Sequence, residues 1–188
     1  MKKIALFLCL VFICLSFTCC SSCGSSNAQA PCTEQQVRQL MERNLDCYIA
    51  IFALSHLPHT GDEVTSGFYQ VSTSYFNSYK ELDDFVRSTY TKEKADELMN
   101  IYPENQGPLY SEINGMLCVN TKISPAQENY SVTWNDDYKV EFLTNDKEKC
   151  TFKLTTTEVN SEGVENPYVI EGSAVFEDGE FKLTEMYH

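Results

Sequence analysis

The sequence predicts a mixed α+β fold, in which N-terminal helices pack on a curved antiparallel β-sheet. Apolar residues recur at spacings of three and four in parts of the first half of the chain, as expected for amphipathic helices. From residue 109 onward, short alternating segments are separated by Asn, Asp and Gly, as expected for strands joined by turns. Helices followed by a run of antiparallel strands define the α+β class.

Three helices are expected. The first covers residues 33–54, where the Thr33 hydroxyl caps the first turn and Gln36 reaches back to it. Helices at residues 78–90 and 91–99 follow, and each opens with a capping hydroxyl residue. The apolar side of the first helix consists of Val37, Leu40, Met41, Leu45, Tyr48, Ile49 and Phe52.

The strands are expected mainly in the second half of the chain. One strand at residues 68–76 precedes the second helix. Segments 109–113 and 116–119 flank Asn114-Gly115, which is the strongest short signal for a hairpin. Further strands are expected at residues 130–134, 138–143, 150–159, 168–176 and 180–187.

The N-terminus has the three-part layout of a secretory signal. Lys2 and Lys3 supply the basic start, residues 4–17 are apolar or small, and a small polar stretch follows. The apolar run is shorter than the roughly 20 residues that a membrane-spanning helix needs. We therefore expect a signal peptide at residues 1–20 and a protein that works outside the cytoplasmic membrane.

The end of the signal contains candidate lipidation sites. Residues 15–20 are similar to the lipoprotein signal in which a cysteine becomes the lipidated first residue, with Cys20 or Cys19 in that position. The spacing from the leucine is one or two residues longer than usual. The alternative is ordinary cleavage after Ala28 or Ala30, which gives a freely secreted protein. We expect a lipoprotein on the extracellular face of the cytoplasmic membrane.

The rest of the chain is expected to form a flexible tether and one domain. Residues 21–31 are rich in Ser, Gly and Asn, and residues 32–188 suffice for a single core. An aromatic content of 12% argues against disorder. The net charge is −13, and loss of Lys2 and Lys3 with the signal takes it to −15. Such a charge disfavours nucleic acid and favours a basic partner, or simply keeps the protein soluble.

Nine cysteines resemble a disulfide framework, but five of them lie in the signal or its exit. Of the remaining four, Cys32 and Cys47 lie about 22 Å apart if both belong to one helix, which is too far for a disulfide. We expect Cys118 and Cys150 to pair, because both fall in strands predicted to be neighbours. The alternative is that they are buried free thiols. The spacing of these cysteines does not match a zinc site.

No catalytic motif is found in the sequence. His56 and His59 occur in a loop without a third metal ligand nearby, so we expect no metal and no cofactor. Cys47 lies on the apolar side of the first helix, and a buried structural thiol is a better interpretation than a nucleophile. We therefore expect a protein that is not an enzyme.

One part of the chain resembles a known family. The residues concerned are the runs Gly67–Val71, Tyr75–Leu82, Tyr90–Ala95 with Leu98, and Tyr110–Val119. Their order of strand, capped helix, Tyr-Thr-x-Glu helix and Asn-Gly-x-Leu hairpin resembles the exported Gram-positive family that includes the IseA-type inhibitors of DL-endopeptidases. These runs cover about a third of the chain. Met116-Leu117-Cys118 departs from the usual Lys-Leu-Tyr of the family.

This resemblance implies a binding protein at the cell envelope that inhibits a peptidoglycan hydrolase of the cysteine-peptidase type. Loops on a rigid sheet would block the cleft of the enzyme. The candidates for partner binding are Asn114, Gly115 and Met116 in one loop, and Asn135, Asp136 and Asp137 in the other. The alternative for both loops is a plain hairpin turn.

A different function is also open. A helix-backed curved sheet resembles the cystatin-like or NTF2-like shape, whose concave face can hold a small ligand. Such a site needs a roomy pocket with convergent polar groups. The aromatic side chains that could line it are Tyr138, Phe142, Phe152, Tyr168, Phe176 and Phe181, which are otherwise simply the core.

Overall fold

The computed structural model confirms a mixed α+β fold. Its helical elements are α1 (Glu34–Asp46), the π-helical η1 (Cys47–Phe52), α2 (Tyr79–Thr89) and α3 (Lys92–Asn100). None of the described helices is both long and apolar enough to cross a membrane. The structure describes residues 30–72, 74–100, 107–124, 132–134, 138–159 and 162–188. The expected signal peptide, its cysteines and most of the tether lie outside these residues.

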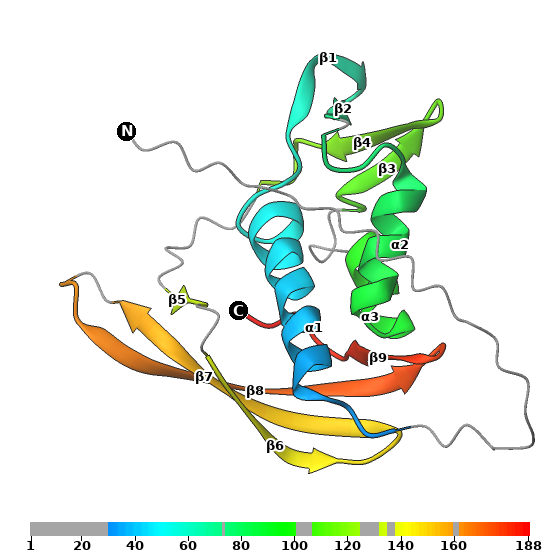
Figure 1. The fold of residues 1–188 in the computed structure, drawn as a ribbon. Helices are drawn as coiled ribbons and strands as arrows, with labels where there is room; N and C mark the ends of the chain where they lie inside the picture. The colour runs from blue at the N-terminus through cyan, green and yellow to red at the C-terminus, as the bar shows by residue number, and fades with distance from the viewer. Residues whose placement is uncertain (1–29, 73, 101–106, 125–131, 135–137, 160–161) are drawn as a thin grey trace, which may run out of the picture.

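The strands form two antiparallel sheets rather than the single sheet expected from the sequence (Figure 1). The small sheet has the order β1-β2-β4-β3, and the large sheet has the order β5-β7-β8-β9, with β6 also paired to β7. The small sheet consists of β1 (His59–Thr65), β2 (Phe68–Val71), β3 (Tyr110–Ile113) and β4 (Met116–Asn120). The large sheet consists of β5 (Val132–Thr133), β6 (Lys139–Asn145), β7 (Lys149–Val159), β8 (Glu165–Glu177) and β9 (Glu180–Leu183).

The two sheets are separate because β4 pairs with an early strand. Its residues lie opposite β2, with Tyr69 facing Val119 and Gln70 facing Cys118. The β3–β4 hairpin therefore joins the strands that precede α2, and the C-terminal meander forms its own sheet. Most of the later strands lie close to the expected positions, but β9 ends at Leu183 instead of residue 187, and β2 ends at Val71 instead of residue 76. The pairing between distant segments could not be derived from local patterns.

The first helix begins as expected and ends differently. The Thr33 side chain accepts a hydrogen bond from the Gln36 N–H, and the Thr33 N–H donates to the Gln36 side chain, which completes the capping box. After Asp46 the helix continues as η1, where the Tyr48 carbonyl accepts from the N–H groups of both Ala53 and Leu54. The predicted helical segment at 33–54 is thus present, with a wider final turn.

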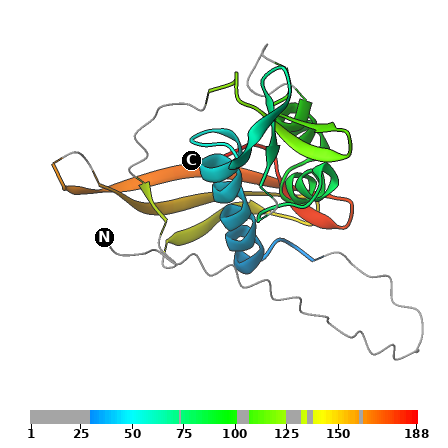
Figure 2. The same cartoon turned by 90° about the horizontal axis from the view of Figure 1, so that it is seen from above.

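A single cluster of buried residues extends through both sheets. The helix α1 begins beside the large sheet and leads through η1 toward the small sheet (Figures 1 and 2). On β7, Cys150, Phe152 and Leu154 are buried, whereas the residues between them are only half-buried. This alternation shows that one face of the large sheet supplies the core. Between α2 and α3, Tyr90 forms a parallel bridge with Leu183 of β9 and so connects the helices to this sheet.

Two hairpins have the same turn geometry. Asn114 and Gly115 have φ angles of 52° and 77°, and Asp178 and Gly179 have φ angles of 54° and 92°. Two successive residues with positive φ characterise the type I′ turn, which suits the twist of a two-residue hairpin. The hairpin predicted at Asn114-Gly115 is therefore confirmed.

Gly172 is required for the packing of the large sheet. A Cβ atom at Gly172 would lie 2.5 Å from a ring carbon of the buried Phe152. Substitution Gly172→Ala is therefore expected to lower the free energy of unfolding by about 1–3 kcal/mol through overpacking. Chemical denaturation measures this effect.

Gly61→Ala is the matched control, because a Cβ atom at Gly61 would have no neighbour within 4 Å. It is expected to change stability by no more than about 0.5 kcal/mol. Equal denaturation midpoints for the two variants would contradict the proposed packing role of Gly172.

Candidate functional site

The predicted partner-binding hairpin is exposed at the edge of the small sheet. Asn114 and Gly115 form the turn between β3 and β4 and are exposed, whereas Met116 is half-buried. Behind the turn, Tyr110 and Leu117 are buried, so the base of the hairpin is fixed by packing. The Tyr110 hydroxyl also donates to a backbone carbonyl of η1 at 2.5 Å. We call Asn114, Gly115 and Met116 the hairpin tip.

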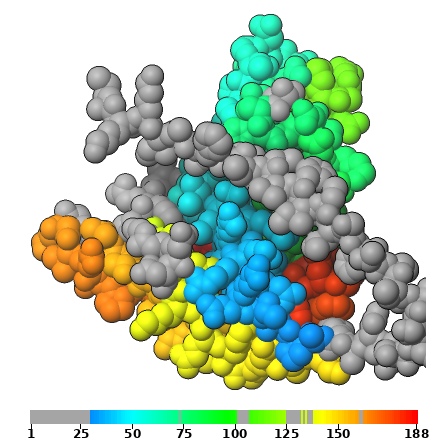
Figure 3. Space-filling model, viewed as in Figure 1, coloured from blue at the N-terminus to red at the C-terminus, as the bar shows by residue number. Residues whose placement is uncertain are grey.

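The small sheet stands out at one end of the molecule (Figure 3). Phe68 of β2 faces Asn120 of β4, so the hairpin tip lies at the opposite end of this sheet from the turn between β1 and β2. The tip is therefore a separate surface from the β1–β2 turn. The second predicted loop, formed by Asn135, Asp136 and Asp137, lies outside the described residues.

The edge strand β1 is almost entirely exposed. It carries the acidic residues Asp62 and Glu63, and its pairing with β2 shifts register on both sides of Glu63. Irregular pairing and charge are typical of edges that are protected against the addition of another strand. The β1 edge is thus poorly suited to bind a partner through backbone hydrogen bonds.

His56 and His59 lie close together, but the expectation that both lie in a loop was wrong, because His59 is the first residue of β1. The ring centroids of His56 and His59 are 6.0 Å apart, and His59 also lies 4.9 Å from the ring of Tyr69. Among the described residues, no group of three or more His, Cys, Asp or Glu side chains is arranged to hold a metal ion. The pair therefore packs as aromatic rings.

Cys47 lies in a buried environment that suppresses its reactivity. Its side chain has no exposed surface, and desolvation raises the pKa of the Cys47 thiol to about 12 despite a hydrogen bond with Tyr90. A thiol with a raised pKa carries little of the nucleophilic thiolate. The geometry thus favours a structural role for this cysteine.

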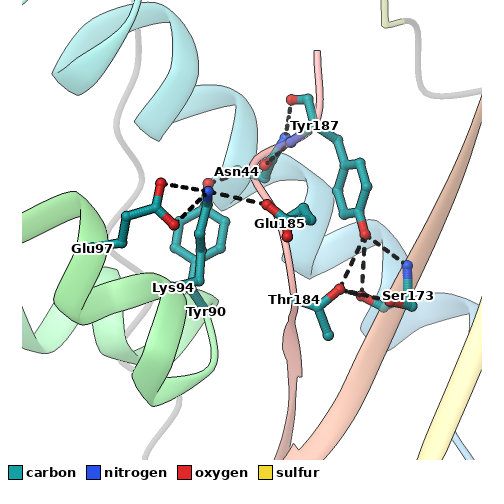
Figure 4. A network of polar contacts seen from close by, with 8 residues as sticks. All are labelled: Asn44, Tyr90, Lys94, Glu97, Ser173, Thr184, Glu185 and Tyr187. Atoms are coloured by element: carbon teal, nitrogen blue, oxygen red, sulfur yellow. Dashed lines mark hydrogen bonds and ion pairs between the residues drawn. The ribbon is translucent and has the colours of Figure 1, made fainter. Parts of the chain in front are cut away.

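A network of polar contacts holds the C-terminal segment in place (Figure 4). Asn44 of α1 is fully buried, and its side-chain carbonyl accepts from the Tyr90 hydroxyl at 3.0 Å and from the Tyr187 N–H at 2.8 Å. The amide group of Asn44 donates to the Tyr187 carbonyl at 2.6 Å. One side chain thus connects α1, the end of α2 and the segment after β9.

The other half of the network connects the C-terminal segment to the large sheet and to α3. The Tyr187 hydroxyl accepts from the Ser173 N–H at 2.8 Å, and the hydroxyls of Ser173 and Thr184 lie 2.6 Å apart. Lys94 forms ion pairs with Glu97 at 2.9 Å and Glu185 at 3.0 Å. Desolvation by itself lowers the pKa of Lys94, but these two carboxylates outweigh it and leave the pKa raised.

This network is better suited to holding the C-terminal segment in place than to binding a ligand. Among the described residues, no buried side-chain nitrogen or oxygen lacks a hydrogen-bond partner. A binding site usually presents a few convergent polar groups that the ligand satisfies. Asn44 was not identified from the sequence, although the signal was present: it falls on the apolar side of α1, four residues after Leu40 and seven after Val37.

Two of the surface cavities offer a ligand no buried polar group that lacks a partner. A cavity of about 390 Å³ lies between α3 and the large sheet, and the Lys94 side chain that lines it is already paired with two carboxylates. A larger one of about 630 Å³ lies beside Ala30, Phe176 and Phe181. Neither is lined by a buried polar side chain without a partner.

The aromatic side chains considered for a ligand pocket belong mainly to the core. Phe152 and Phe181 are buried in it, and Tyr138, Phe142 and Phe176 pack against it. Tyr168 donates its hydroxyl to the backbone carbonyl of His188 at 2.6 Å. These side chains fill much of the inner face of the large sheet, and a surface cavity of about 540 Å³ remains beside Tyr138, where Thr155, Thr156 and Thr157 also line it.

The expected pairing of Cys118 with Cys150 is not supported. The expectation that these two cysteines lie in neighbouring strands was wrong, because Cys118 lies on β4 of the small sheet and Cys150 lies on β7 of the large sheet. Both are buried free thiols in the structure, as are Cys32 and Cys47. The cysteine beside Cys150 is Cys32, whose thiol forms a hydrogen bond with it.

No protein-family model matches the sequence, and no curated protein matches it.

Substitution of Asn44 should separate the C-terminal segment from α1. Asn44→Ala removes the partners of the Tyr90 hydroxyl and of both backbone groups of Tyr187, and is expected to cost about 2–3 kcal/mol of stability. Chemical denaturation measures the loss of stability, and hydrogen exchange of the Tyr187 amide shows whether the C-terminal segment is released from α1. Asn100→Ala is the control, because its exposed amide donates to the Asp96 carbonyl of its own helix. Unchanged exchange at Tyr187 in Asn44→Ala would show that the network does not hold the segment.

Cys47 is expected to resist alkylation in the native protein. With a pKa of about 12, only about one thiol in ten thousand is ionised at pH 8, and burial further limits access. Treatment with iodoacetamide followed by peptide mapping should show modification of Cys47 only after unfolding in denaturant. Rapid labelling of Cys47 in the folded protein would instead indicate a reactive cysteine and reopen the possibility of catalysis.

Proposed function

We propose that the protein is an exported, lipid-anchored binding protein of the cell envelope, without catalytic activity, that inhibits a peptidoglycan DL-endopeptidase. The observation that carries this proposal is the hairpin tip: an exposed type I′ turn on strands whose inner residues are buried. A rigid, protruding turn can enter the cleft of an enzyme with little loss of conformational entropy. The resemblance of residues 67–120 to the IseA-type family supplies the class of target.

The state of the candidate catalytic groups supports a role without catalysis. Cys47 is buried beside Tyr90, and the ring of His59 packs against the rings of His56 and Tyr69. A cysteine nucleophile needs an adjacent base and an accessible thiolate. The environment of Cys47 instead favours the neutral thiol.

The charge of the chain supports a basic target. The protein carries a net charge of −13, and −15 without Lys2 and Lys3 of the signal. Acidic side chains close to the hairpin tip include the exposed Glu112 of β3. Complementary charge mainly raises the rate of association, so binding to a basic wall enzyme should weaken with salt.

The two-sheet arrangement argues against the cystatin-like or NTF2-like version of the fold. These shapes depend on one curved sheet whose concave face can hold a ligand. Here the helices lie between a small and a large sheet, and the inner face of the large sheet contributes to the core. We therefore place the binding surface on the hairpin tip rather than in a pocket.

The proposal is tested with the protein as bait for a cell-wall extract of its own host. Retention of a wall endopeptidase, together with slower muropeptide digestion as the protein is added, is the expected result. The double variant Asn114→Gly, Met116→Ala keeps a glycine-compatible turn but removes the side chains of the tip. It should weaken inhibition about 10-fold or more, since residues at the centre of an interface carry most of the binding energy.

Asp178→Gly is the matched control, because Asp178 occupies the same position in the other type I′ turn. It is expected to leave inhibition unchanged. If no hydrolase is retained and digestion proceeds at the same rate, the inhibitor proposal is wrong. If the control weakens inhibition as much as the double variant, the hairpin tip is not the binding surface.

A further inference from the structure

The segment that enters α1 is attached to the far end of β6 by a single side chain. The Cys32 N–H donates to the Asn145 side-chain carbonyl at 3.0 Å, and the Asn145 amide group donates back to the Cys32 carbonyl at 2.7 Å. This pair of bonds resembles one rung of a β-ladder. It fixes the backbone of Cys32 beside the last residue of β6.

Asn145 is also the neighbour of the second cysteine. In the register of β6 and β7, Asn145 lies directly opposite Cys150. The Cα atoms of directly opposed residues in antiparallel strands lie about 4.5–5.5 Å apart. Cys32 is therefore held against the strand position that faces Cys150, although the two cysteines are far apart in the sequence.

The two thiols meet in the buried core. Cys32 is 3% exposed and Cys150 is 0% exposed, and both belong to the same cluster of buried residues. A hydrogen bond between the thiols raises the pKa of Cys32 and lowers the pKa of Cys150, so Cys150 is the member that ionises more easily. The more ionised thiol is the one that starts thiol–disulfide exchange.

The other two cysteines have different neighbours. Cys47 forms a hydrogen bond with the Tyr90 hydroxyl, and Cys118 lies on β4 of the small sheet. Cys32 and Cys150 are thus the pair that the fold of the described residues brings together.

We propose that Cys32 and Cys150 form a disulfide that closes the N-terminal segment onto the large sheet. In the cell this requires an oxidising compartment and therefore rests on the proposed export. The oxidant is an external disulfide, either of a small thiol such as glutathione or of a thiol oxidase. The Cys150 thiolate attacks it and releases one external thiol. The Cys32 thiolate then attacks the Cys150 sulfur and releases the second, so two electrons pass to the oxidant and the two cysteine protons pass to solvent or to the released thiolates.

Access to the buried pair needs only a local opening. Ala30 and Pro31 are exposed, and they line the surface cavity of about 630 Å³ together with Thr33. Fraying of this segment lifts Cys32 off Cys150 and opens Cys150 to the oxidant without unfolding α1, and closure brings the thiols together again. Once formed, the disulfide prevents this fraying.

The test uses protein purified from the envelope of its host. It is reduced, re-oxidised with oxidised glutathione, treated with N-ethylmaleimide and digested with trypsin. Cleavage after Lys149 and Lys153 isolates Cys150 in the peptide of residues 150–153. The expected result is that this peptide is linked to Cys32 in the tryptic peptide that ends at Arg38, and fragmentation of that peptide distinguishes Cys32 from Cys23. Linkage to Cys118 or Cys47, or recovery as the maleimide adduct, would overturn the proposal.

A second measurement follows stability. Oxidation should raise the denaturation midpoint of the wild type, because the cross-link restricts the unfolded chain across a long loop. Cys32→Ser and Cys150→Ser should each abolish the difference between oxidised and reduced protein. Cys118→Ala is the control and should retain it; loss of the difference in this variant instead would overturn the pairing.

Mapping the disulfides of the protein as first isolated, before any reduction, distinguishes the proposed export from the proposed Cys32–Cys150 disulfide. A disulfide that forms with glutathione, in a protein recovered from the host fully reduced, supports the pairing and contradicts export to an oxidising compartment. Failure of the pairing with glutathione overturns the disulfide and leaves the proposed binding function unaffected.

Discussion

The arrangement of the helices depends on one buried polar residue, Asn44. The apolar side of α1 carries an amide at a position where the pattern requires a hydrophobic side chain, and burial of an amide is costly unless it is hydrogen-bonded. Its partners are the Tyr90 hydroxyl and both backbone groups of Tyr187. Because these come from the end of α2 and from the C-terminal segment, one orientation of α1 satisfies all of them. Apolar packing alone would tolerate several orientations.

Features determined by neighbouring residues could be predicted from the sequence, and features determined by distant residues could not. The capping box at Thr33 and the turn at Asn114-Gly115 are local, and the structure confirms both. The pairing of β2 with β4 joins segments on either side of two helices, and no local pattern encodes it. The division into two sheets follows from this pairing, so the expectation of a single sheet was wrong for the same reason.

The same distinction applies to the candidate sites. The turn at the hairpin tip could be predicted because it depends only on Asn114 and Gly115 themselves, whereas its role in binding stays a prediction. The cysteine pairing failed because it assumed which strands were neighbours. The contact that brings Cys32 close to Cys150 involves Asn145. The side chain of Asn145 bonds to the backbone of Cys32, and Asn145 lies opposite Cys150 in the pairing of β6 and β7. An asparagine at the end of a strand is ordinarily interpreted as a turn residue. The local sequence around Asn145 therefore did not indicate that its side chain binds the backbone of Cys32.

The positions of the two ends of α1 fit a tethered binding protein. The helix begins where Cys32 is attached to the end of β6, and η1 at its other end leads toward the small sheet that carries the hairpin tip (Figure 1). A lipid anchor upstream of residue 30, as proposed above, would join the domain beside the large sheet through the flexible tether expected at residues 21–31. A disulfide at Cys32 would place the covalent cross-link where the tether meets the domain, so that tension on the tether acts on the large sheet rather than on the first turn of α1.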